Sequence, residues 1–301
     1  MAKARVIIKR RKAVRNIKKI TKVMQMIATA RYQKAYKRAL GTKPYVKKIA
    51  ELVTSVSESV QAAGLKIEHP LLTERPVKAG KIAVLVITSN RGLCGGYNGN
   101  ILRLSNLTLN VAASAGQTPD LYVSGKKGIA YFKFTKRPMA ETYIAIGDNP
   151  KFAEIDQLAD KFVQQYIAGQ IDGLKVVYMQ FLSAGQQKAA VLDILPLSGN
   201  TALATDKLLP LAPVATVTYD FSPSPTEILN ELIPTSVKVS LFQAFIEAAV
   251  SEQIARMVAM KAATDNAEKM TRKLTQDYNR ARQSQITSEL SELMGGVEAL
   301  K

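Results

Sequence analysis

The sequence predicts an α/β protein: a Rossmann-like α/β middle domain between two terminal helices that pair as a long antiparallel coiled coil. Residues 235–294 contain no glycine or proline, and residues 1–40 contain none either. Between these runs, short apolar segments alternate with helical patterns. A helix over residues 235–294 would be roughly 90 Å long, whereas a compact globule of this size has a radius of gyration of about 19 Å. We therefore expect function to lie in reach and contact.

The N-terminal helix is expected to face a partner helix through an apolar stripe. The stripe consists of Val14, Ile17, Ile20, Met24 and Ile27. Steps of three and four residues are typical of coiled coils. Gly41 and Pro44 predict a kink or break, after which residues 45–62 resume helical spacing and Gly64 ends the helix. A linker over residues 66–80 follows.

The middle of the chain changes from helical periodicity to short apolar runs. Strands are predicted over 81–88, 121–124, 142–146, 174–182 and 189–195, and helices over 97–115, 126–134 and 152–168. The first strand, KIAVLVIT, is apolar and rich in β-branched residues, which is typical of a buried parallel strand. The alternation predicts a partly parallel sheet.

A proline-rich connector over residues 196–225 leads into the last helix. Ser224 as N-cap, Pro225 at the first helical position and Glu227 predict where that helix begins. Pro234 is expected to kink it early. The expected segments of the whole chain are therefore an N-terminal coiled-coil helix over 1–64, an α/β domain with linkers over 65–223 and a C-terminal helix over 224–301.

The last helix carries its own predicted seam. Its positions are Met260, Ala263, Ala267, Met270 and Leu274, followed by Asp277 and Ala281. A repeat of 3.5 residues predicts a left-handed supercoil, and the alanines let a partner helix approach closely. Because the C-terminal run is the longer one, its apolar end is expected to protrude alone. That end contains Ile286, Leu290, Leu293, Met294, Val297 and Leu300.

Charge is concentrated at the N-terminus. Residues 1–50 hold 17 Lys and Arg and no Asp or Glu, which leaves 25 basic and 24 acidic residues for the rest of a chain whose net charge is +18. This imbalance favours an acidic partner. The single cysteine, Cys94, excludes an internal disulfide and a cysteine zinc cluster. No run of about 18 apolar residues is evident, so we expect no membrane span.

One glycine-rich loop invites a nucleotide-binding interpretation. In SNRGLCGGYNG, residues 89–99, the glycine spacing matches neither the dinucleotide fingerprint nor the P-loop. Tight turning and close helix–strand packing are the favoured explanation. The acidic residues of the last helix are expected to be mostly solvated beside Lys and Arg; they are Glu247, Glu252, Asp265, Glu268 and Asp277. We expect no catalytic site, no cofactor and no metal.

The basic N-terminal helix has two interpretations. A nucleic-acid-binding arm of the basic-zipper type separates its basic segment from its apolar seam. Here the basic residues and the apolar seam residues occupy the same segment, which favours a protein partner with an acidic surface. A coiled-coil scaffold or a nucleic-acid-binding arm on an α/β module remains the alternative.

Three segments carry a family resemblance. RNIKKITKVMQMIATAR (15–31), ITSNRGLCGGYN (87–98) and the segment 247–293 closely resemble the gamma subunit of F-type ATP synthases, in the right order along the chain. In that family the subunit is a non-catalytic rotating shaft inside a ring of three alpha and three beta subunits, which carry the nucleotide sites. Its α/β domain forms a foot, together with the epsilon subunit, on the membrane-embedded c-ring.

The resemblance implies partners and a location. The partners would be the alpha, beta and epsilon subunits and the c-ring, with no nucleic acid and with the membrane reached only through the c-ring. The location would be the cytoplasmic face of a bacterial plasma membrane. The family loop often has aspartate where this chain has Asn90, and the cysteine pair of plastid members is missing, so redox regulation of that type is not expected.

The resemblance also implies site residues. Met24 and Arg256 fall where the family's shaft meets beta-subunit loops, and Arg282, Gln283 and Thr287 fall where beta loops catch the shaft higher up. The tip would turn in an apolar sleeve; its residues are Ile286, Leu290, Leu293, Met294 and Val297. The foot would face the ring through Tyr219, Phe221 and Glu227.

Overall fold

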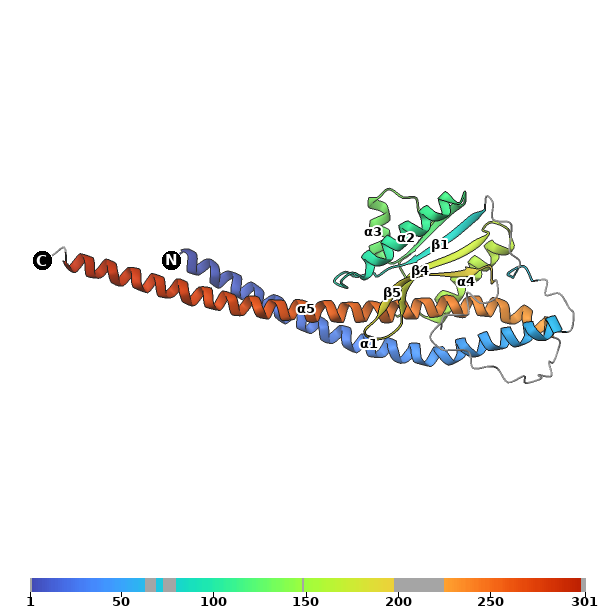
Figure 1. Cartoon of the computed structure of the whole chain (residues 1–301), viewed down its shortest axis with the longest axis horizontal. Helices are drawn as coiled ribbons and strands as arrows, with labels where there is room; N and C mark the ends of the chain where they lie inside the picture. Colours follow the sequence, from blue (N-terminus) through green and yellow to red (C-terminus); the bar gives the residue numbers. More distant parts are fainter. Residues whose placement is uncertain (1, 63–68, 73–79, 148, 198–224, 299–301) are drawn as a thin grey trace. The chain divides into compact units, whose positions relative to one another are not determined.

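A 61-residue helix opens the chain and a 74-residue helix closes it, with a five-stranded sheet between them in sequence (Figure 1). The computed structural model describes residues 2–62, 69–72, 80–147, 149–197 and 225–298. The elements are α1 (Ala2–Ala62), β1 (Lys81–Ile87), α2 (Tyr97–Ser114), β2 (Thr118–Ser124), α3 (Lys126–Phe134), β3 (Glu141–Tyr143), α4 (Phe152–Ile167), β4 (Gly173–Phe181), β5 (Gln187–Leu195) and α5 (Pro225–Glu298).

Every predicted strand and helix is present, with ends displaced by a few residues. The predicted break at Gly41 and Pro44 was wrong, because α1 continues through both. A proline inside a helix costs about 3 kcal/mol, but Ala39 and Ile49 on either side are buried, and this packing holds the helix together. The start of α5 at Pro225 is confirmed. The predicted helix end at Gly64, the N-cap Ser224 and the connector to residue 224 lie outside the described residues.

The sheet is mixed and doubly wound. Its strand order is β3-β2-β1-β4-β5, with every neighbouring pair parallel except β4 and β5. Helices α2 and α3 cover one face, and α4 with α5 covers the other (Figure 1). The predicted Rossmann-like, partly parallel sheet is therefore confirmed.

Two hydrophobic cores lie on the two faces of the sheet. Alternate residues of β1 point to opposite faces, so Leu85 packs in the core with α4 and α5 whereas Val84 packs in the core with α2 and α3. The first core is the larger and encloses the aromatic side chains Tyr122, Phe162, Tyr166, Tyr178 and Phe245. Because both faces are covered, β1 is apolar and buried from Ile82 to Ile87, with only Lys81 at its start exposed.

The described chain forms two compact units. Unit 2, residues 31–255, contains the sheet, α2 to α4 and the adjoining parts of the two long helices. Unit 1, residues 1–30 and 256–301, consists of the start of α1 and the rest of α5. The boundaries fall inside α1 and α5, so each long helix contributes to both units.

One 18-residue stretch of α5 is apolar enough to cross a membrane by length and composition alone. Its mean hydropathy is 1.2, and 78% of it is buried inside the protein. Such burial is the signature of the core helix of a globular domain. The exposed surface of this stretch is therefore too small for a lipid-facing helix.

Candidate partner-binding site

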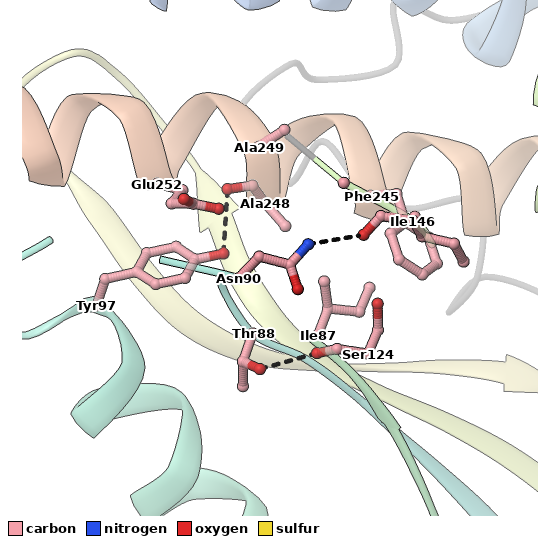
Figure 2. Close-up of a pocket in the computed structure, with 11 residues that line it drawn as sticks. Ile87, Thr88, Asn90, Tyr97, Ser124, Ile146, Phe245, Ala248, Ala249 and Glu252 are labelled. Carbon is pink, nitrogen blue, oxygen red and sulfur yellow. Dashed lines mark hydrogen bonds between the residues drawn. The ribbon is translucent and has the colours of Figure 1, made fainter. Parts of the chain in front are cut away.

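The crevice where doubly wound sheets bind ligands lies between β1 and β4, where the helices change faces. In this chain α5 fills it. Figure 2 shows Phe245 and Ala248 of α5 beside the end of β1, and the hydroxyl of Tyr97 donates to the backbone oxygen of Ala248 at 3.1 Å. The remaining cavity, about 20 Å³, holds roughly one water molecule. A helix therefore occupies the place of a nucleotide.

The glycine-rich loop after β1 is held by its own side chains. Asn98 accepts from the backbone N–H of Ser89 at 3.1 Å and donates to the Ser89 hydroxyl at 2.8 Å. Cys94 is buried beside them. The loop needs a left-handed backbone at Gly95, where φ is 57°, which glycine adopts without strain. Close packing at this turn agrees with the expected structural role of the loop.

Asn90 ties three separate loops together. Its side-chain oxygen accepts from the backbone N–H of Lys126 at 3.0 Å, and its amide donates to the backbone oxygen of Ile146 at 3.5 Å (Figure 2). An aspartate could accept but could not donate. Asparagine at this position therefore adds a contact that local sequence patterns do not reveal.

Unit 1 is an antiparallel helix pair. Three contacts fix its direction: Arg11 lies 5.0 Å from the ring centroid of Tyr278, Lys18 Nζ lies 3.3 Å from Glu268 Oε2, and the Thr264 hydroxyl donates to the Thr21 hydroxyl at 2.8 Å. Residue numbers rise along α5 as they fall along α1. The expected antiparallel pairing is confirmed.

The seam of unit 1 is made of small and polar side chains. Among the described residues of unit 1, those buried on α1 are Thr21 and Ala28, and those on α5 are Arg256, Met260, Thr264 and Ala267. Thr21 and Ala28 are one heptad apart, as in a coiled coil. Small side chains let the backbones approach, and the threonine hydroxyls satisfy each other inside the seam.

Three of the five residues of the predicted apolar stripe of α1 face solvent, whereas Val14 and Met24 are partly buried. Ile17, Ile20 and Ile27 are 51%, 59% and 49% exposed. On α5, Met270 is also exposed, whereas Ala267 is buried as predicted. The isoleucine stripe and the Thr–Ala stripe recur at similar spacing along α1. The Thr–Ala stripe forms the contact with α5 because small side chains permit a closer approach of the two helices. The isoleucines are left facing solvent among lysines and arginines.

In unit 1, the Glu268 carboxylate forms ion pairs with two basic side chains, Lys18 and Arg272. These partners, Lys18 first, lower the pKa of the Glu268 carboxyl. Since residues 1–50 contain no acid, a Lys or Arg of this segment can form an ion pair only with an acidic residue elsewhere in the chain or on a partner.

The expected contact residues lie in different environments. Arg282, Gln283 and Thr287 are exposed, with Gln283 and Thr287 one turn apart on the same face of α5. Met24 is partly buried, whereas Arg256 is only 6% exposed and so presents little surface.

The apolar tip is confirmed as exposed at four positions: Ile286, Leu290, Leu293 and Met294. The side chain of Val297 and all of Leu300 lie outside the described residues. So do Tyr219 and Phe221 of the expected foot surface, while Glu227 is exposed in the first turn of α5.

Two acidic residues expected to be solvated are not. Glu247 and Glu252 are 4% and 5% exposed. A signal was available, because no Lys or Arg occurs between Lys238 and Arg256. Carboxylates in an apolar stretch without nearby cations are candidates for buried hydrogen-bonded positions rather than a solvated face. No group of three or more metal-ligating side chains occurs in the described part of the chain.

Comparison with known proteins gives consistent matches. A family model described as ATP synthase matches residues 3–300. The ATP synthase gamma chain of Rhodopirellula baltica is 43% identical over 301 residues, covering the whole of both chains. That of Frankia casuarinae is 40% identical over 296 residues, covering 97% of this chain and 96% of the relative.

Solved structures with the same fold include rotor components. The Euglena gracilis mitochondrial ATP synthase rotor is 19% identical with a TM-score of 0.63, covering 95% of this chain and 99% of that one. A central stalk and c-ring structure from Tetrahymena thermophila is 21% identical with a TM-score of 0.55, covering 81% and 99%. At these identities the likeness concerns the fold.

Proposed function

Because this chain belongs to the family of ATP synthase gamma chains, we propose that it is the central-stalk rotor of an F-type proton-translocating ATP synthase and has no catalytic site of its own. The helix pair of unit 1 is the observation that supports this proposal. Its small seam brings the helices together, while its large apolar and basic side chains point outward. A shaft enclosed by other subunits needs this distribution.

The outward side chains would contact a ring of three alpha and three beta subunits. Apolar contact is non-directional, so it permits turning without a deep energy minimum at any angle. The excess of Lys and Arg on α1 suits acidic loops of beta, attracting them without a fixed lock. Met24, Arg256, Arg282, Gln283 and Thr287 remain the proposed beta contacts, with Arg256 the weakest candidate because it is buried.

The ends of the chain would have separate tasks. The exposed tip from Ile286 to Met294 would turn in an apolar sleeve, where contact through apolar side chains would keep rotational barriers low. The foot would sit with an epsilon subunit on the c-ring, and Tyr219, Phe221 and Glu227 are proposed to face it. The complex would lie on the cytoplasmic face of a bacterial plasma membrane.

Rotation would change nucleotide affinity without any nucleotide binding to this chain. Each beta subunit would meet a different side of the shaft in turn. A contact shifts a conformational equilibrium only by the difference in its free energy between the two states. The outward faces of α1 and α5 carry different side chains, so the shaft is asymmetric and supplies this difference.

Co-expression with alpha and beta subunits tests the proposal. The tagged chain should bring down both subunits together with magnesium-dependent ATPase activity. A bead on a cysteine introduced at exposed Ser183, in a Cys94→Ala background, should rotate in one direction when the ring is immobilised and supplied with ATP. ATP hydrolysis by the purified chain alone, or tight DNA binding at physiological salt in place of ring assembly, would overturn the proposal.

A further inference from the structure

A buried carboxylate lies where α1, α5 and β4 meet within unit 2. Glu247 of α5 is 4% exposed. The Tyr178 hydroxyl and the Phe181 backbone N–H, both on β4, donate to its Oε2 at 3.4 Å each. The Gln243 side chain, one turn earlier on α5, donates to its Oε1 at 3.0 Å. One carboxylate thus joins the helix to the sheet at two points.

The network continues to the other long helix. The Thr42 hydroxyl of α1 lies 3.2 Å from Gln243 Oε1, with a geometry suited to donation. A path of side-chain hydrogen bonds therefore runs from α1 through α5 to β4. The contacts of Gln243 with α1 and of Glu247 with β4 join residues far apart in sequence, so no helical or strand periodicity predicts them.

The surroundings are apolar. Ala39, Ile246 and Val250 form a small core between α1 and α5, and Tyr36 packs edge-on against Phe181 with ring centroids 5.8 Å apart. Burial, and then the nearby Glu247 carboxylate, raises the pKa of Tyr178. Tyr178 therefore stays protonated and remains a donor. In such surroundings hydrogen bonds are stronger than in water, and losing one partner is costly.

Apolar contacts alone would not fix the rotation of α1 and α5 about their own axes or their position along those axes. Burial of apolar area is non-directional, so a helix can turn or slide by a fraction of a turn at small cost. Hydrogen bonds have narrow ranges of length and angle. Buried polar groups that are fully bonded can therefore select one register among similar packings.

We propose that Glu247 is a positioning residue that fixes the rotational setting of α1 and α5 on the sheet, so that torque on the foot turns both helices instead of slipping. This inference rests on the proposed rotor function. Glu247 acts through Tyr178 and Gln243. It contacts no reacting group, so its loss should affect the coupling of rotation to catalysis more than catalysis itself.

The test uses the assembled ATP synthase in sealed vesicles and measures ATP-driven proton pumping per ATP hydrolysed. Tyr178→Phe and Gln243→Leu each remove part of the network and keep most of the side-chain volume. Each should lower pumping per ATP about two- to tenfold, the change in an equilibrium that losing one hydrogen bond produces. ATP hydrolysis should persist at or above the wild-type rate. Glu247→Gln keeps one acceptor and should fall between these variants and wild type.

Leu158→Ala is the matched control, since it removes a buried side chain of the same core from α4 without touching the network. It should lower thermal stability and leave pumping per ATP unchanged. If Tyr178→Phe and Gln243→Leu leave pumping per ATP unchanged, as this control does, the proposed positioning role of Glu247 is wrong. Failure of the wild-type chain to assemble or pump would instead overturn the rotor function.

Discussion

The two units of this chain bury different kinds of side chain. Unit 2 encloses large aromatic and branched residues, and Phe132, Phe162, Tyr166 and Tyr178 are almost completely covered. Unit 1 buries alanine, threonine, one methionine and one arginine, while Ile17, Ile20 and Ile27 face solvent. Burial of apolar area is the main source of folding free energy. Unit 2 therefore supplies its own stability, whereas unit 1 gains little from its seam.

This difference suits the two tasks of the chain. A foot that receives torque has to stay folded as one body. A shaft inside a ring can leave its apolar side chains for the ring, because the partner completes their burial. Apolar side chains grouped on an exposed surface generally mark such contacts. Substitutions in one unit at a time test this difference.

The largest expected effect lies in unit 2. Phe162→Ala removes a fully buried ring that packs edge-on against Tyr122, with centroids 5.0 Å apart. The free energy of unfolding should fall by about 3–5 kcal/mol, measured by urea denaturation of the isolated chain. Ile20→Ala in unit 1 is the control and should stay within about 0.5 kcal/mol of wild type. Similar losses for the two variants would erase the distinction.

Next in size is an effect on assembly. Replacing Ile17, Ile20 and Ile27 together by alanine removes exposed apolar area without reducing helix propensity. Each half-exposed side chain stands to gain about 1 kcal/mol on further burial, so the affinity for an alpha–beta ring should fall roughly a hundredfold. Titration of immobilised ring with labelled chain measures this.

The matched triple variant changes Leu107, Val111 and Phe134 to alanine. These residues are also exposed and apolar, but they lie on α2 and α3. Ring affinity should not change. Equal losses in the two triple variants would mean that the isoleucine face is not the specific contact surface.

A smaller effect is expected inside the seam. Ala28→Leu forces a large side chain into the close approach of the unit 1 helices, which should cost about 1–3 kcal/mol. Faster amide exchange in residues 14–28 would report it. Ala30→Leu is the control at a neighbouring exposed position and should leave amide exchange unchanged. If Ala28→Leu also left amide exchange unchanged, the small-residue seam would be contradicted.

The smallest effect depends on pH. The pKa of Glu268 is lowered in the folded chain, so its contribution to stability is present above the ordinary value of 4.5 and is lost as pH falls through the lowered value. The melting temperature of wild type should exceed that of Glu268→Gln at pH 7, and the gap should close once the pH falls below the lowered pKa of the Glu268 carboxyl. A gap that persists in acid would assign the difference to packing.

Hydrophobic periodicity predicts the sheet well because both of its faces are covered. KIAVLVIT reads as a buried strand for this reason, and the helices around it follow from the 3.6-residue pattern. Periodicity fails on α1, where two stripes of similar period compete. An apolar stripe that contacts another chain has the same spacing in the sequence as one that packs within its own chain.

Two further misses have a different origin. The sequence predicts solvent exposure for Glu247 and Glu252 because charged side chains are usually exposed. The burial of Glu247 depends on donors from β4, which is distant in sequence, and Glu252 lines the cavity beside Asn90 and Tyr97. The bonds of Asn90 to Lys126 and Ile146 likewise connect separate loops. Such contacts follow from the tertiary arrangement and leave no local pattern.

Amide hydrogen exchange of the isolated chain, compared with the chain in its alpha–beta ring, tests the contrast between the units most directly. We expect residues 5–30 and 256–290 to exchange much faster than β1 and β4 in the isolated chain and to become strongly protected in the ring. We expect β1 and β4 to be equally protected in both states. If residues 5–30 of the isolated chain were already as protected as β1, unit 1 would be stable on its own, and the contrast between the units would be wrong.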